Sequence, residues 1–267
     1  MSAMQVINGT AVNPSSTITA LTPNTGDSYT VRNTAQGTPI NWIEAWAYTT
    51  TNLLFRVRSP LMHDQAQNQR LKPTASQPYP LMSGAMIQPL QPQDNIIAEI
   101  TGGTSETDAA AMLVYYDNLP GTAARLHSPA EVLPLVQNLT TVEVDLTSAA
   151  TAGAYSATVA LNGSFDTLKR NYDYAILGYE CPTVGVSLGI TGVDTGNLRV
   201  GGPLSNLSFL TKNWFVDLSN RTGKPCIPII NSANVAGVNL DVVAIATSTA
   251  YQVGVVLAQL GPTGQLS

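Results

Sequence analysis

Apolar and polar residues alternate in short runs along most of this chain. The clearest runs are residues 53–58, 142–146, 155–161, 184–190 and 251–257. Alternation with a period of two is typical of strands that bury one face. Turn-forming segments such as Pro23-Asn24-Thr25-Gly26 and Gly201-Gly202-Pro203 separate the runs. Many short strands punctuated by glycine and proline predict an all-β sandwich or barrel.

One helix is marked at the middle of the chain. Ser128-Pro129-Ala130-Glu131 has the pattern of a capping box with proline at the first helical position. The apolar residues Val132, Leu133, Leu135 and Val136 follow it. We therefore expect a linker helix over residues 128–138.

The order of elements repeats when the chain is shifted against itself by roughly 130 residues. Identities are few, but the match continues without a gap over nearly half the chain. It pairs Asn41-Trp42 with Asn171-Tyr172, Ile97 with Ile227, and Met112 with Val242. A chance likeness between two β-rich stretches is the alternative, and duplication is favoured because the helix stands at the joint. We expect one barrel over residues 1–127, with an arm over 1–16, and a second over 139–267 with a short C-terminal tail.

Charged residues make up only 11% of the chain, against about 25% in ordinary soluble domains. A neutral surface suits a protein that packs against copies of itself, although secreted adhesins share this composition. The net charge is −5, and the first basic residue is Arg32. The N-terminal segment cannot neutralise phosphates, so no direct binding of nucleic acid is expected.

No targeting segment is visible. Residues 1–4 lack the basic start of a signal peptide, and the apolar stretch Val253–Leu260 is too short to span a bilayer. We expect the protein to be made and folded in a cytoplasm. Cys181 and Cys226 are then expected to be reduced and packed, although the sequence leaves a disulfide between them open.

Two tandem barrels joined by a short helix in a charge-poor chain resemble the double jelly-roll major capsid proteins of tailless icosahedral viruses, especially phages with an internal membrane. The resemblance covers Thr17 to Leu260 and rests on architecture and length, without a diagnostic short motif. It implies two eight-stranded jelly-roll barrels and homotrimers of pseudo-hexameric outline that tile a virus shell. It also implies a place in the virion, assembly in the host cytoplasm, and contacts with other virion proteins and an internal lipid membrane. The loops at about residues 60–80 and 191–213 are the longest candidates for an outward projection.

Six aromatic residues are candidates for anchors at the trimer interface, with a place in a barrel core as the competing interpretation. They are Trp42, Trp46, Tyr48, Tyr172, Tyr174 and Tyr179.

The residues that could carry catalysis or bind a metal are sparse. His63 and Asp64 are neighbours, and adjacent residues on a strand point to opposite faces, so a surface loop is expected. His127 is expected to be a solvated residue at the joint, and Glu143 and Asp145 to lie on a solvated outer face. Two histidines exclude a His-rich metal site. We therefore expect no catalytic site, no metal, no cofactor and no enzymatic activity.

Three other functions stay open. A carbohydrate-binding or adhesin module would expose aromatic residues on loops and need a secretion route. A hydrolase on a β-sandwich would need converging acids or a histidine-based site. A minor capsid or vertex protein would differ from a major one in its copy number.

Overall fold

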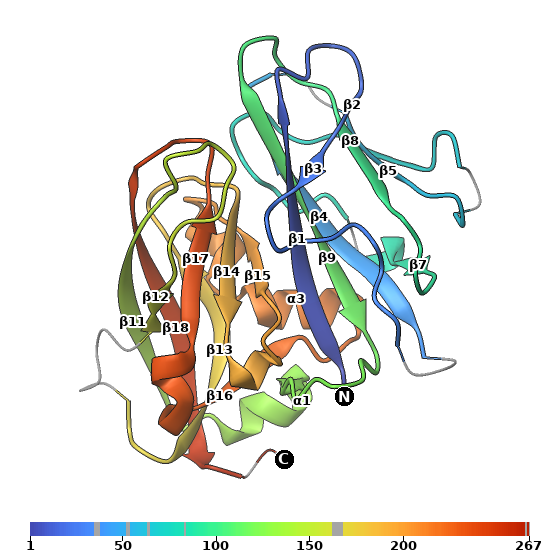
Figure 1. The fold of residues 1–267 in the computed structure, drawn as a ribbon. Coiled ribbons are helices and arrows are strands. Elements are labelled where there is room, and N and C mark those ends of the chain that lie inside the picture. The colour runs from blue at the N-terminus through green and yellow to red at the C-terminus, as the bar shows by residue number, and fades with distance from the viewer. Residues whose placement is uncertain are drawn as a thin grey trace.

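The computed structural model describes residues 1–34, 38–51, 54–62, 65–82, 84–161, 168–264 and 266. Two β-barrels follow each other along the chain and stand side by side (Figure 1). Each barrel is built from a five-stranded and a four-stranded antiparallel sheet.

Nine strands lie in the described part of the first barrel. One sheet has the order β3-β1-β9-β4-β7 and the other the order β2-β8-β5-β6. The strands are β1 (Ala3–Val12), β2 (Thr19–Ala20), β3 (Thr22–Pro23), β4 (Ile40–Tyr48), β5 (Phe55–Arg58), β6 (Gln69–Leu71), β7 (Gln88–Leu90), β8 (Ile97–Ile100) and β9 (Thr107–Tyr116).

The described residues of the second barrel also form nine strands. Its sheets have the orders β10-β16-β13-β18-β11 and β12-β17-β14-β15. The strands are β10 (Leu126–His127), β11 (Asn138–Thr147), β12 (Val159–Ala160), β13 (Tyr172–Glu180), β14 (Ser187–Thr191), β15 (Val200–Pro203), β16 (Ile227–Asn231), β17 (Asn239–Val243) and β18 (Ala250–Pro262).

The two barrels share one topology. With the short strands β3 and β10 set aside, eight strands remain in each, and their sheet orders are 1-8-3-6 and 2-7-4-5 in both barrels. This is the jelly-roll order, in which two Greek keys close a double sheet. The prediction of two tandem eight-stranded jelly rolls is confirmed.

The ungapped register of the repeat is wrong, because the second barrel carries an insertion. β14 begins at Ser187, 132 positions after β5 begins at Phe55, whereas β18 begins at Ala250, 143 positions after β9 begins at Thr107. Part of the difference lies between β15 and β16, where the helices α2 (Ser208–Thr211) and α3 (Trp214–Thr222) stand. Ile97 in β8 therefore does not correspond to Ile227 in β16.

The expected N-terminal arm over residues 1–16 is also wrong. Residues 3–12 form β1, which pairs along its whole length with β9, from Ala3 opposite Tyr116 to Val12 opposite Thr107. Nine of the ten positions of β1 are buried or half-buried. The apolar residues point to both faces of the sheet, because this strand is covered on both sides.

The linker helix is shorter than expected. The chain forms helix α1 (Pro129–Val132) and a 3-10 turn η2 (Leu133–Leu135), and β11 begins at Asn138. The capping box is present, since the Ser128 backbone N–H donates to Glu131 Oε2 at 2.8 Å. Pro134 lacks the N–H group that a continuing α-helix needs, so the turn tightens and the chain is extended at Val136. The preceding strand β10 already pairs with β16, so the second barrel begins before this helix.

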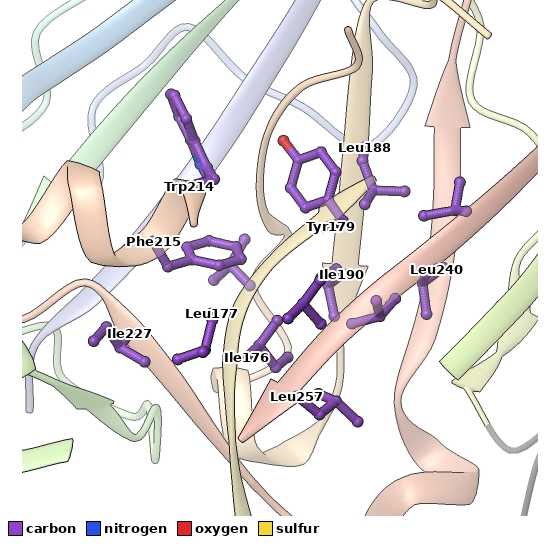
Figure 2. Packing of buried hydrophobic residues seen from close by; sticks show 14 of the residues in the cluster. Ile176, Leu177, Tyr179, Leu188, Ile190, Trp214, Phe215, Ile227, Leu240 and Leu257 are labelled. Carbon is purple, nitrogen blue, oxygen red and sulfur yellow. The ribbon is translucent and has the colours of Figure 1, made fainter. Parts of the chain in front are cut away.

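The described connections also contain the 3-10 turns η1 (Gly84–Met86), η4 (Val193–Thr195) and η5 (Ser232–Gly237). The core of the second barrel is shown in Figure 2. Trp214 and Phe215 of α3 pack on β13 from the side opposite Ile190, Leu240 and Leu257. The helical insertion therefore covers part of the outer face of the five-stranded sheet.

Candidate functional site: the junction between the barrels

The five-stranded sheet of the first barrel is buried on both faces. One face packs into its own barrel, and the other packs against β14, β15 and β17 of the second barrel. Met4 and Val6 of β1 and Trp46 of β4 belong to the hydrophobic cluster of the second barrel. The backbone N–H of Val6 donates to the carbonyl of Arg199 at 2.8 Å. The two barrels are therefore joined by one continuous apolar interior.

Trp46 is the central aromatic residue of this junction. Its side chain is fully buried, and its Nε1 donates to Ser187 Oγ of the second barrel at 3.1 Å. Its ring meets the Trp214 ring edge to face, with centroids 5.9 Å apart at 85°. The Trp214 Nε1 in turn donates to the carbonyl of Gly201 at 2.9 Å. Both indole N–H groups are thus satisfied inside an apolar contact.

A polar chain continues from Trp46 across the junction. Ser187 Oγ donates to Asn8 Oδ1 at 2.6 Å, and Asn8 Nδ2 donates to the Tyr155 hydroxyl at 2.8 Å. The Tyr155 hydroxyl donates to Asp27. Successive members of this chain come alternately from the first and the second barrel. A satisfied buried network of this kind favours a single relative placement of the barrels.

Arg199 compensates the charge at the end of that network. Its guanidinium lies 3.6 Å from the centroid of the Tyr155 ring, pairs with Asp241 at 3.0 Å and approaches Asp27 at 3.6 Å. Burial raises the pKa of Asp27 and of Asp241, and the charge of Arg199 opposes this rise. Two buried carboxylates therefore share one guanidinium at the junction.

Glu44 and Arg221 form a second charged contact between the barrels. Arg221 Nη1 lies 2.6 Å from Glu44 Oε2, and the Glu44 side chain is fully buried. Burial raises the pKa of Glu44, while Arg221 and the backbone N–H groups of Met82 and Ala45 lower it. At Gly84, a Cβ atom would lie 1.7 Å from the carbonyl oxygen of Arg221. Glycine is therefore needed at position 84, where the 3-10 turn η1 meets the end of α3.

The third charged contact joins Lys224 to Asp117 at 3.1 Å, with the ammonium 4.9 Å from the centroid of the Tyr115 ring. Within the described part of the chain, the ion pairs that cross the junction are Asp27–Arg199, Glu44–Arg221 and Asp117–Lys224. The first barrel supplies the acid in every pair and the second barrel the base. In each of these ion pairs, a negative charge of the first barrel thus meets a positive charge of the second barrel.

The six aromatic candidates have two kinds of environment. Trp42, Trp46, Tyr174 and Tyr179 are buried within the chain, and their side chains leave no surface for a second chain. Tyr179 donates its hydroxyl to the carbonyl of Pro203 at 3.1 Å. Tyr48 and Tyr172 are half-buried. Of the six, only these two keep a partly open side chain.

Of the other residues singled out from the sequence, His63 and Asp64 lie outside the described residues. The structure shows the positions of the rest. The expectation of a solvated His127 is wrong: its side chain is 14% exposed, Nδ1 lies 3.7 Å from Glu131 Oε2, and burial lowers its pKa. Glu143 and Asp145 are exposed on β11, as expected. Cys181 and Cys226 are buried free thiols, which confirms the favoured interpretation.

Among the described residues, no group of three or more His, Cys, Asp or Glu side chains could hold a metal ion. No helix in the described ranges is long and apolar enough to cross a membrane.

The sequence pattern did not predict the residues that α3 brings to the junction, Trp214 and Arg221. α3 begins after Asn213 and ends at Gly223, whose backbone is left-handed, and buries Trp214, Phe215 and Leu218 along one side. The i, i+4 spacing of Trp214 and Leu218 followed by a glycine was the signal that could have found it. Beside the helix, Phe209 is 73% exposed at a surface hollow of about 490 Å³ that Tyr79 and Pro80 also line.

The chain was compared with known proteins. No family model matches it, and no curated protein matches its sequence. Among solved structures, the PBSX exported protein XepA is 9% identical with a TM-score of 0.27, over 97% of this chain and 86% of that one. The STIV MCP is 10% identical with a TM-score of 0.22, over 100% and 99% of the two chains. An atomic structure of Sulfolobus Turreted Icosahedral Virus is 10% identical with a TM-score of 0.23, over 99% and 92%. These TM-scores are too low to support an assignment, so the double jelly roll rests on the strand order.

Proposed function

We propose that this chain is a structural coat protein that assembles with copies of itself into the shell of a virus particle. The observation that carries the proposal is the packing of the two barrels. They share one topology, and the five-stranded sheet of the first lies against the four-stranded sheet of the second. In the described part of the chain, two sheet faces of the same kinds are not packed against the other barrel, namely the four-stranded sheet of the first barrel and the part of the second barrel's five-stranded sheet around β11.

This packing supports a ring rather than a two-fold dimer. A contact between two different faces is heterologous, and its repetition closes into a ring when the rotation per step permits. Three chains supply six barrels of like topology, which gives a homotrimer with a pseudo-hexameric outline. Such trimers can tile an icosahedral shell, because each chain occupies two similar places in the lattice.

The composition fits this role. Only 11% of residues are charged, so a large contact between copies has little charge to desolvate. The proposed location is the virion, after assembly in the host cytoplasm, with other virion proteins and an internal membrane as further partners. In this proposal the chain has no enzymatic activity and no direct contact with nucleic acid.

A carbohydrate-binding module is the second candidate, and Phe209 is the observation that favours it. An exposed aromatic ring beside Tyr79 at an open hollow offers a stacking surface for a sugar. A glycan array probed with the purified protein tests this candidate, with Phe209→Ala as the matched variant. Binding that Phe209→Ala removes would favour the module over the coat protein.

The proposal is tested by the solution state of the purified chain. Size-exclusion chromatography with light scattering should give a trimer or larger assemblies, and electron microscopy should show particles with a pseudo-hexagonal outline. A monomer that persists at high concentration, at both low and high salt, would overturn the proposal. A trimer found at few copies per particle would instead indicate a minor capsid or vertex protein.

A further inference from the structure

We propose that the acidic outer face of β11 and β18 in one copy binds the basic outer face of β5 and β6 in a second copy. The contact would repeat the arrangement by which the two barrels pack within the chain. This inference rests on the proposed self-assembly and names the two faces that make it.

The outer face of β11 is an unpartnered sheet surface. Along this strand Val142, Val144 and Leu146 are buried, whereas Glu143 and Asp145 between them are exposed, and Leu139 before them is 59% exposed. In the described structure nothing covers this part of the sheet, because α2 and α3 lie over β13 instead.

The acidic side chains of this face form one row. Gly254 of β18 lies opposite Glu143 of β11 on one side and opposite Glu180 of β13 on the other. A Cβ atom at Gly254 would lie 3.2 Å from Glu143 Oε1 and 3.3 Å from Glu180 Cγ, so both side chains extend over the glycine. Lys212 pairs with Glu180 at 3.3 Å. A surface hollow of about 290 Å³ lies here, lined by both glutamates, Gln252 and Gly254. It can receive a long basic side chain.

The outer face of β5 and β6 has the opposite charge. Arg56 and Arg58 point outward from β5, and both bind Glu99 of β8, at 2.7 and 3.0 Å. Burial would raise the pKa of Glu99, but the hydrogen bonds and charges of the two arginines lower it overall. Arg70 of β6 and Lys72 beside it are exposed. Among its described residues, this face therefore carries four basic groups and one acid.

The two free faces carry opposite charges, as do the groups that meet across the junction within the chain. There the first barrel supplies the acid of each ion pair, such as Glu44 of β4, and the second supplies the base, such as Arg199 just before β15, whose charge Asp241 of β17 also shares. The free five-stranded face of the second barrel is acidic, and the free four-stranded face of the first is basic. Matching charges across a contact guide encounter and fix orientation.

The two faces lie at opposite sides of the molecule, as the positions of β11 and β5 in Figure 1 show. Each copy can therefore offer its acidic face to one neighbour and its basic face to another. A contact of this kind excludes a closed two-fold dimer and leads to a ring or a longer assembly.

Charge reversal tests the assignment in the full-length chain. The variant Glu143→Lys/Asp145→Lys and the variant Arg70→Glu/Lys72→Glu should each weaken self-association by about tenfold or more, because each places like charges opposite one another. Combining all four substitutions in one chain makes the faces complementary again and should restore part of the lost association, since Arg56 and Arg58 keep their positive charge. Arg170→Glu, at an exposed turn before β13, is the matched control. Thermal melting shows that each variant folds.

The outcomes separate this inference from the proposed function. If the wild-type chain assembles and neither charge-reversed variant is weakened, the faces named here are wrong while the coat-protein proposal stands. If both are weakened but the fourfold variant does not recover, the faces do not meet each other and the inference is overturned. If the wild-type chain is monomeric, both proposals fail.

Discussion

Trp46 of the first barrel meets Trp214 of the second edge to face, with ring centroids 5.9 Å apart at 85°. The two residues come from β4 and from α3, an element that has no counterpart among the described residues of the first barrel. The helix inserted into the second copy of the jelly roll thus supplies an aromatic partner for the first copy. This contact fixes how the two barrels lie relative to each other, although their topologies are alike.

The Trp46→Ala variant should lose about 3–5 kcal/mol of unfolding free energy, because it leaves a cavity in the junction and the Ser187 hydroxyl without its donor. Trp46→Phe keeps most of the volume and should lose clearly less. Urea unfolding followed by fluorescence and circular dichroism measures both. A loss below about 1 kcal/mol for Trp46→Ala would show that the junction contributes little to stability.

The Arg221→Ala variant should be destabilised by about 3 kcal/mol, because it leaves the carboxylate of Glu44 buried without its partner. The loss should be smaller in a Glu44→Gln background, where no buried charge is left. A double-mutant cycle in urea measures the coupling between the two side chains. Equal losses in both backgrounds would contradict the pairing.

Asp108 should make the protein less stable as pH rises. It lies fully buried in β9, and burial raises its pKa from 3.8 to about 6, with a smaller contribution from the charge of Glu106. The folded chain therefore binds a proton between pH 6 and 4 that the unfolded chain does not, so this stabilisation is present at low pH and is lost as pH rises through 6.

The matched variant is Asp108→Asn. It should resemble the wild type near pH 4 and exceed it above pH 6, by at most about 3 kcal/mol. Urea unfolding across this pH range measures the difference. A difference that stays constant with pH would rule out the titration of Asp108 as its cause.

The two thiols should be unreactive in the folded protein. Burial raises the pKa of Cys226 to about 12 and that of Cys181 as well, so little thiolate is present at pH 8. For Cys226 the shift from 9.0 lowers the thiolate fraction about a thousandfold. A thiol-reactive chromophore should react slowly with the native chain and promptly with two thiols in denaturant. Release of fewer than two thiols by denaturant alone would indicate a disulfide.

Some elements could be predicted correctly from the sequence because residues close together in the chain determine them. The alternation in residues 142–146 describes β11 correctly, because this strand has one face in a core and one face in solvent. The capping box at Ser128 and Glu131 also follows from neighbouring residues alone. The likeness of the two halves was detectable because both encode the same order of strands.

The arm, the register of the repeat and the helix α3 were decided by contacts between distant parts of the chain. Residues 3–12 do not alternate between apolar and polar side chains, because both faces of this strand are buried. One face packs inside the first barrel, and the other packs against the second barrel. A pattern of apolar residues tells which side chains leave water and does not tell what they meet. The sequence alone therefore determined that the chain forms two jelly rolls in tandem. Only the tertiary structure decided which sheet of one lies against which sheet of the other, because that choice depends on groups such as Trp46, Glu44 and Arg221, which come together from far apart in the chain.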